Sequence, residues 1–124
     1  MTNFLLVGGG GFLGATLRYL IYMGVLNYSS IKPFYGTTSA NLIGCLLGGI
    51  AFKFFDPSLN QTNPYYFFFV VGFLGSLTTL SALAGESVAA LLNGQWGIFS
   101  FHVALNVFGG ILVFFAPILI WPKP

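Results

Sequence analysis

A few polar and charged residues interrupt long apolar stretches of this 124-residue chain, and they are the groups that could do chemistry. Thr79 and Glu86 are seven residues apart, which places them on one face of a helix. His102 and Asn106 are four apart and share a face in the same way. In an apolar environment such side chains should face protein or water. They could contact a solute that crosses a membrane, or bond one helix to another.

The inventory of reactive groups argues against an enzyme. Besides its many apolar residues the chain has one histidine, one cysteine and two carboxylates, namely His102, Cys45, Asp56 and Glu86. No Ser/His/Asp triad or metal-ligand spacing can be assembled from that set. The net charge of +2 comes without a basic cluster, so we expect no nucleic-acid partner.

The composition indicates a protein of the lipid bilayer. Hydrophobic residues make up 56% of the chain and charged residues 5%, whereas soluble domains carry about a quarter charged residues. The apolar stretches approach the ~20 helical residues that cross a hydrocarbon core. We expect an all-α membrane protein, one domain over 1–124. Four helices this short cannot enclose a pathway alone, which predicts an oligomer. The predicted transmembrane helices are about 4–25, 36–55, 65–92 and 96–121.

The third span is longer than a crossing requires. Gly72 and Gly75, followed by Thr78 and Thr79, indicate a helix broken at mid-membrane. Broken helices expose carbonyls to cations and amide groups to anions in transporters and channels. A continuous helix with small packing residues explains the same pattern, so both interpretations stay open.

Polar stripes on three spans favour transport, because together with a broken helix they could line a narrow pathway. Glycines four apart also mark places where two helices can approach closely. The polar stripes are Thr37, Asn41, Gly44 and Gly48 in the second span, Thr79 and Glu86 in the third, and His102, Asn106 and Gly109/Gly110 in the fourth. The glycines four apart are Gly10 and Gly14 in the first span, and Gly44 and Gly48 in the second.

The positive charges give almost no preference for one orientation in the membrane. Lys53 and Lys123 lie on one side and Lys32 on the other, while Arg18 is too deep to count. This balance predicts dual topology or an inverted partner. The alternative is that a few charges decide the orientation weakly.

The segment Gly72 to Glu86 reads GFLGSLTTLSALAGE and resembles the central motif of the Fluc (CrcB) fluoride channel family, roughly G-x-x-G-G-x-T-T-F-S-T-F-x-x-E. Residues 9–19 resemble the opening motif of that family, G-G-x-x-G-A-x-x-R-Y. Gly36-Thr37 with Asn41 and Gly44 resembles its second-helix motif. The three motifs stand in the family order and cover almost the whole chain.

The resemblance implies a fluoride-specific channel subunit for passive export across the plasma membrane, built as an antiparallel, dual-topology dimer. It implies a structural Na⁺ held by the carbonyls of Gly75 and Thr78 from each subunit, and hard oxygen donors suit such a cation. The implied ion pathway comprises Arg18, Asn41, Thr79, Leu80, Ser81, Leu83, Glu86, Asn106 and Gly110.

Several positions depart from the family pattern. Leu80 and Leu83 stand where the family has phenylalanines, whose ring edges carry partial positive charge. Gly110 and Phe114 align with a serine and a threonine of the family's fourth helix. The chain could therefore form a homodimer, or be the degenerate, non-conducting partner in a heterodimer. A small multidrug exporter is a further alternative. Such exporters need a carboxylate in the first helix, and the first helix of this chain carries Arg18 instead.

Overall fold

The described residues of the computed structural model are 2–28, 34–55 and 63–120, and their regular structure is entirely helical. This confirms the all-α prediction for that part of the chain. Lys32, Asp56 and Lys123 lie outside these ranges, so the predicted charge balance is not visible in the structure.

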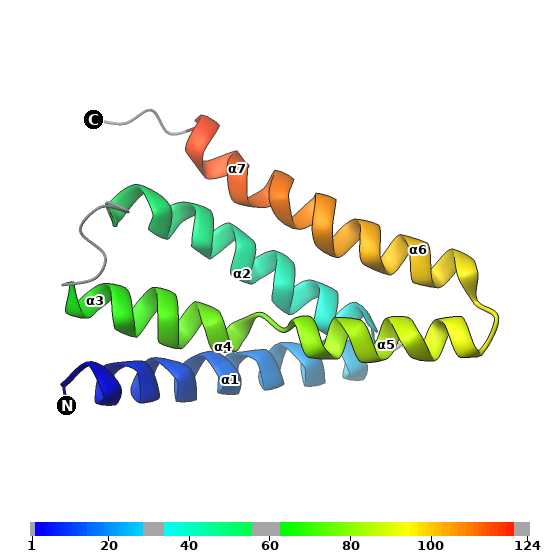
Figure 1. Ribbon diagram of the computed structural model, residues 1–124, viewed down its shortest axis with the longest axis horizontal. Coiled ribbons are helices and arrows are strands. Elements are labelled where there is room, and N and C mark those ends of the chain that lie inside the picture. The colour runs from blue at the N-terminus through cyan, green and yellow to red at the C-terminus, as the bar shows by residue number, and fades with distance from the viewer. Residues whose placement is uncertain (1, 29–33, 56–62, 121–124) are drawn as a thin grey trace.

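The helices form four rods that run side by side (Figure 1). The rods consist, in order, of α1 (Thr2–Tyr28); α2 (Phe34–Phe54); α3 (Pro64–Tyr66), the π-helix η1 (Phe67–Leu74), α4 (Gly75–Leu77) and α5 (Leu80–Leu92); and α6 (Trp96–Ala104), the π-helix η2 (Leu105–Gly109) and α7 (Gly110–Ile120).

Three stretches of the described residues are long and apolar enough to cross a membrane, namely Thr2–Asn27, Pro64–Leu92 and Trp96–Ile120. The second rod, α2, has 21 residues and packs against α1 and α7. Large apolar side chains such as Phe4, Leu92 and Leu119 are mostly exposed, which in water would be unfavourable.

Local signals in the sequence explain where the third rod begins and ends. Asn63 caps its first turn by accepting a hydrogen bond from the N–H of Tyr65 at 3.0 Å, and Pro64 occupies the first helical position. At the other end Gly94 adopts a φ of 69°, a left-handed conformation that glycine adopts without a Cβ clash. The chain then turns back into α6.

Glycines allow α1 to lie directly on the third rod. A Cβ on Gly10 would collide with the carbonyl oxygen of Phe68, and one on Gly14 with that of Phe73. From the opposite side, a Cβ on Gly72 would lie 2.6 Å from the carbonyl oxygen of Val7. The two backbones are therefore in contact, as small residues permit in lipid.

The third rod is interrupted between α4 and α5 (Figure 1), which confirms the predicted break and excludes a continuous helix. Thr78 (φ −83°, ψ 152°) and Thr79 (φ −148°, ψ 114°) have extended backbones. The glycines that suggested the break are themselves helical: Gly72 is buried against α1 and Gly75 begins α4. The two threonines, not the glycines, supply the unwound residues.

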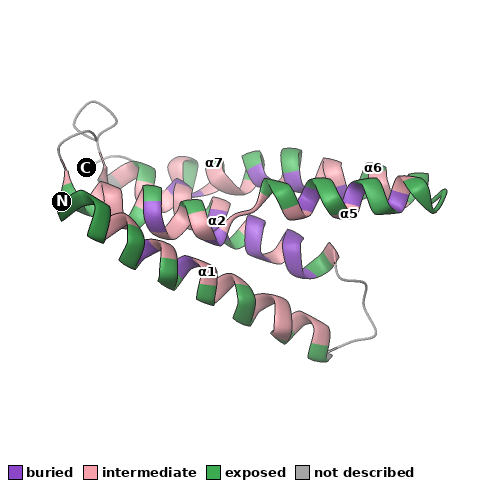
Figure 2. Ribbon diagram, turned by 60° about the horizontal axis from the view of Figure 1, so that its bottom comes forward, coloured by how far each residue is buried: buried purple, intermediate pink, exposed green. Residues whose placement is uncertain are grey.

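The buried positions lie on the inner faces of the rods (Figure 2). Polar side chains outnumber apolar ones among these buried positions. The apolar set is Ala40, Leu77, Leu83 and Ala90, and the polar set is Thr37, Thr38, Asn41, Ser87, His102 and Asn106. The centre of the described structure is therefore held by hydrogen bonds as much as by apolar packing.

Candidate functional site

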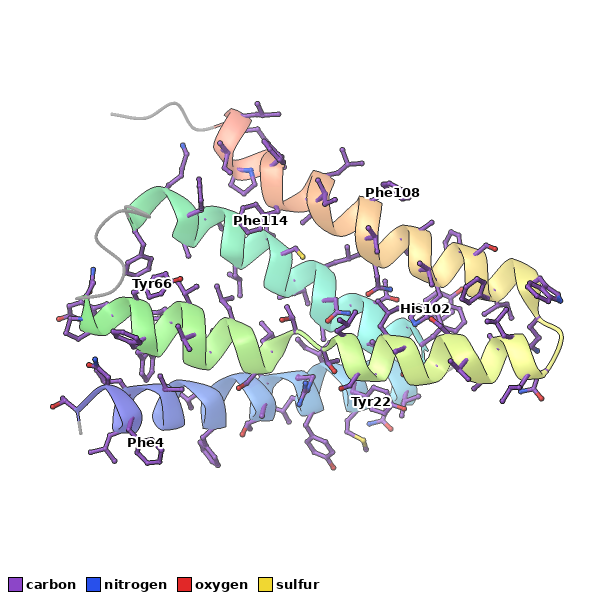
Figure 3. All side chains as sticks on the ribbon, viewed as in Figure 1. Phe4, Tyr22, Tyr66, His102, Phe108 and Phe114 are labelled. Carbon is purple, nitrogen blue, oxygen red and sulfur yellow. The ribbon has the colours of Figure 1, made fainter. Side chains whose placement is uncertain are left out.

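One connected group of polar side chains lies between α2, the helix break, α5 and α6. We call it the polar seam. Figure 3 shows His102, one of its members, on α6 in the central part of the structure. The polar seam consists of Thr37, Thr38, Asn41, Thr79, Glu86, His102 and Asn106.

Asn41 of α2 bonds to the unwound backbone at Thr79. The N–H of Thr79 donates to Oδ1 of Asn41 at 2.7 Å, and Nδ2 of Asn41 donates to the carbonyl oxygen of Thr79 at 3.3 Å. The Oγ1 of Thr79 accepts the N–H of Ala82 at 3.3 Å and so caps α5. An amide side chain therefore replaces part of the hydrogen bonding that the broken helix lacks.

Asn106 connects Asn41 and the helix break to the fourth rod. Its Oδ1 accepts a hydrogen bond from Nδ2 of Asn41 at 2.8 Å. Its own Nδ2 lies 2.9 Å from Oγ1 of Thr38 and 2.8 Å from the carbonyl oxygen of His102. The side chain of Asn106 is 8% exposed, so these bonds compete little with water.

Glu86 is contacted through both of its carboxylate oxygens. The hydroxyl of Thr37 donates to Oε1 at 2.7 Å. Nε2 of His102 lies 3.1 Å from Oε2, within ion-pair distance but without the alignment of a regular hydrogen bond. On the other side of the ring, Nδ1 of His102 is 3.1 Å from Oγ1 of Thr38. Glu86 is thus tied to both α2 and α6.

A cavity of about 660 Å³ opens beside Glu86, between α1, α2 and α5. We call it the Arg18 cavity. Two tyrosines, two threonines and one serine line it together with the oppositely charged Arg18 and Glu86. Its polar lining is Arg18, Tyr19, Tyr22, Thr37, Thr79, Ser81 and Glu86. Four of the predicted pathway residues, Arg18, Thr79, Ser81 and Glu86, therefore come together here.

The two leucines at the family's phenylalanine positions lie in different environments. Leu80 is 78% exposed, whereas Leu83 is 7% exposed and belongs to the buried apolar set. Neither residue lines the Arg18 cavity. Residues three apart on a helix can share a face, but within a single chain these two side chains do not share a surface.

Gly110 and Phe114 lie away from the Arg18 cavity, on the side of α2 that faces α7. A Cβ on Gly110 would be 3.2 Å from Sγ of Cys45. The ring of Phe114 covers Gly48 and meets the ring of Phe52 edge to face at 6.0 Å. Phe114 is thus part of the contact between α2 and α7, where no hydroxyl is required.

Gly75 and Thr78, the predicted cation ligands, line a second cavity of about 530 Å³ together with Gly44 and Gly48. In a continuous helix the N–H of Thr79 would bond to the carbonyl of Gly75, and that of Ala82 to the carbonyl of Thr78. Here those N–H groups donate to Asn41 and to Oγ1 of Thr79. The break thus diverts the usual helical donors of these two carbonyls.

Thr38 is a member of the polar seam that sequence reasoning missed. It is 4% exposed and contacts both Asn106 and His102. Its position three residues before Asn41 was the available signal, because residues three apart share a helical face. Among the described residues no group of three or more His, Cys, Asp or Glu side chains could hold a metal ion.

These features define a small, helical, multi-pass membrane protein with a polar interior, as transport of a polar solute requires. The chain belongs to the family described as CrcB-like protein, Camphor Resistance (CrcB), whose model matches residues 5–118. This membership confirms the resemblance seen in the three sequence motifs.

Curated relatives cover most of the chain. A protein of Ralstonia pickettii (strain 12J) is 38% identical over 111 residues, or 90% of this chain and 87% of the relative. One from Bacteroides fragilis is 36% identical, covering 91% and 89%. One from Flavobacterium psychrophilum is 34% identical, covering 96% and 95%. All three are named fluoride-specific ion channel FluC.

Proposed function

We propose that this chain is a subunit of a fluoride-specific ion channel that lets fluoride leave the cell passively across the plasma membrane. The names of the relatives support this proposal, and so does the Arg18 cavity beside the polar seam. The cavity is the observation that carries it, because it places an obligate cation and several hydroxyl groups next to a break in a membrane helix.

Fluoride is a small, strongly hydrated anion, so a narrow pathway must replace the lost water with hydrogen-bond donors. Arg18 offers up to five N–H donors. Thr79 and Ser81 lie 3.1 Å apart, oxygen to oxygen, and one hydrogen is spent on the bond between them. The pair therefore keeps one hydroxyl hydrogen for an anion.

Asn41 and Thr37 have fewer donors to offer than their chemistry suggests. Both N–H groups of Asn41 are directed at Thr79 and Asn106, and the hydroxyl of Thr37 is directed at Glu86. In this arrangement the free donors belong to Arg18, the Thr79–Ser81 pair and the two tyrosines of the cavity. This distribution supports Arg18 and Ser81 as direct anion contacts, with Asn41 acting through the backbone.

We also propose four crossings, with α2 as the fourth, and a dual-topology dimer of antiparallel subunits. At 1.5 Å per residue the 21 residues of α2 reach about 30 Å, the thickness of a hydrocarbon core. A cysteine added at the C-terminus of a Cys45→Ala chain tests the orientation. Labelling of about half of the molecules from one side of intact cells is expected, while uniform labelling in parallel subunits contradicts it.

A structural Na⁺ bound by the carbonyls of Gly75 and Thr78 is part of the same proposal. The diverted N–H groups at the break support it, since carbonyl oxygens without their helical donors suit a hard cation. A bound ion should raise thermal stability in Na⁺ relative to N-methylglucamine, by mass action. Equal stability in both cations, with folding intact, would count against the site.

Fluoride efflux from liposomes tests the channel itself. The purified chain is assayed alone and then mixed with a related subunit, with chloride as the control anion. Selective fluoride efflux under either condition supports the proposal, and the condition that works distinguishes a conducting homodimer from a degenerate partner. No efflux under both conditions contradicts it. A small multidrug exporter is less well supported, because residues 2–28 contain no carboxylate.

A further inference from the structure

We propose that Asn106 and His102 are positioning residues in a hydrogen-bond relay that has a fixed donor–acceptor direction and joins the helix break to the carboxylate of Glu86. The relay begins at the backbone N–H of Thr79. Because this group can only donate, its partner must be an acceptor, and this sets Oδ1 of Asn41 toward the break at 2.7 Å.

The first step of the relay fixes the orientation of both asparagines. With its oxygen toward Thr79, Asn41 turns its NH₂ group toward Asn106, which must present its oxygen, and the two atoms lie 2.8 Å apart. The NH₂ group of Asn106 then faces α6 and Thr38. It donates to the carbonyl oxygen of His102 at 2.8 Å, an atom that can only accept, so the orientation is determined from both ends.

The second step fixes the tautomer of the imidazole. Oγ1 of Thr38 accepts a hydrogen bond from Asn106 at 2.9 Å and keeps its own hydrogen for Nδ1 of His102 at 3.1 Å. Nδ2 of Asn106 lies 3.3 Å from the same nitrogen, with its two hydrogens directed at Oγ1 of Thr38 and at the carbonyl oxygen of His102. We therefore assign Nδ1 as the acceptor of the Thr38 hydroxyl and the ring proton to Nε2, the nitrogen that lies beside the carboxylate of Glu86.

The last step reaches the Arg18 cavity. Nε2, which carries the ring proton, lies 3.1 Å from Oε2 of Glu86, while the hydroxyl of Thr37 donates to Oε1 at 2.7 Å. The carboxylate is thus hydrogen-bonded to α2 and in short contact with the imidazole of α6, at the wall of the cavity. The relay therefore couples the backbone at the break to the position of the negative charge beside the anion pathway. Only its effect on permeation rests on the proposed function.

The single histidine of the chain makes the tautomer directly measurable. The full chain, labelled with ¹⁵N-histidine in lipid nanodiscs, gives one pair of ring nitrogen signals. A protonated Nε2 with an unprotonated Nδ1 at neutral pH is the expected result. A protonated Nδ1 in the unmodified chain overturns the proposal. Because no ion is involved, this result is independent of whether the chain conducts fluoride.

Two variants test the direction and the coupling. Asn106→Asp replaces a donor by an acceptor beside Nδ1 and should place a proton on that nitrogen; an unprotonated Nδ1 contradicts the relay. Asn106→Ala removes the partner of Asn41, so exchange of the Thr79 amide hydrogen should become about fivefold faster, the effect of one typical hydrogen bond. Ser100→Ala, at an exposed position of α6, is the matched control and should change neither signal. Unchanged Thr79 exchange in folded Asn106→Ala protein also overturns the proposal.

Discussion

Asn41 takes the place of a neighbouring helical turn for Thr79. Its oxygen accepts the N–H of Thr79 at 2.7 Å, and its nitrogen lies 3.3 Å from the carbonyl oxygen of the same residue. One side chain from α2 thus pairs with the N–H of Thr79, which the broken helix leaves without its helical acceptor, and also contacts the carbonyl oxygen of the same residue. In a membrane, where water cannot supply these bonds, the break depends on this contact.

Replacing Asn41 by leucine should therefore destabilise the protein. Leucine has a similar size but leaves the N–H of Thr79 and Oδ1 of Asn106 without a partner, at a cost of about 1–3 kcal/mol. Unfolding in detergent, followed by helical circular dichroism, measures the change. Asn3→Leu, at an exposed position of α1, is the control and should leave stability unchanged. Equal stability of the two variants would contradict the role of Asn41.

Two glycines of α1 form a matched pair for testing helix contact. A Cβ on Gly14 would collide with the carbonyl oxygen of Phe73, whereas one on Gly24 would meet nothing within 4 Å. Gly14→Ala should lower the free energy of unfolding by about 1–3 kcal/mol, because α1 must move away from the third rod. Gly24→Ala should not, since alanine favours helix over glycine. The same unfolding assay applies, and a harmless Gly14→Ala would mean that the backbones are not in contact.

Leu80 and Leu83 should respond differently to phenylalanine. Leu83 is buried, so Leu83→Phe should overpack its site and cost about 1–3 kcal/mol, while Leu80→Phe at a 78% exposed position should cost little. In the liposome assay we expect slow or absent fluoride flux from the unmodified chain alone. The double variant should raise it, because ring edges carry partial positive charge.

Fast, selective flux from the unmodified chain would show that this aromatic pair is dispensable. Phe114→Thr serves as a second comparison, because Phe114 aligns with a threonine of the family's fourth helix. Its ring packs on Gly48 and Phe52. The structure therefore predicts that Phe114→Thr lowers stability and leaves flux unchanged.

The charge of Arg18 should set the rate of anion entry. A fixed positive charge in a confined cavity concentrates anions, and Arg18→Gln should lower fluoride flux about tenfold or more. Arg18→Lys keeps the charge and should retain more of the flux. Lys53→Gln removes the same charge from the last turn of α2, outside the Arg18 cavity, and serves as the control. Equal losses from Arg18→Gln and Lys53→Gln would indicate a general effect of net charge.

The sequence by itself determined that this is a helical membrane protein of the CrcB family. Apolar content and the length of the apolar stretches decide that class before any packing occurs, and the three motifs carry the family. It also indicated a broken third helix, since two glycines and a run of hydroxyl residues within one long span are unusual. These are local properties, which a chain expresses wherever its helices come to lie.

Only the tertiary structure decided which partner each polar side chain takes. Spacing placed His102 and Asn106 on one face. It did not show that Asn106 would meet Asn41 from another rod or that Thr38 would join them. It likewise could not separate buried Leu83 from exposed Leu80. Hydrogen bonds between rods depend on the distance and rotation of whole helices. Those are set by backbone contacts such as Gly14 on Phe73, which bring together residues far apart in the chain.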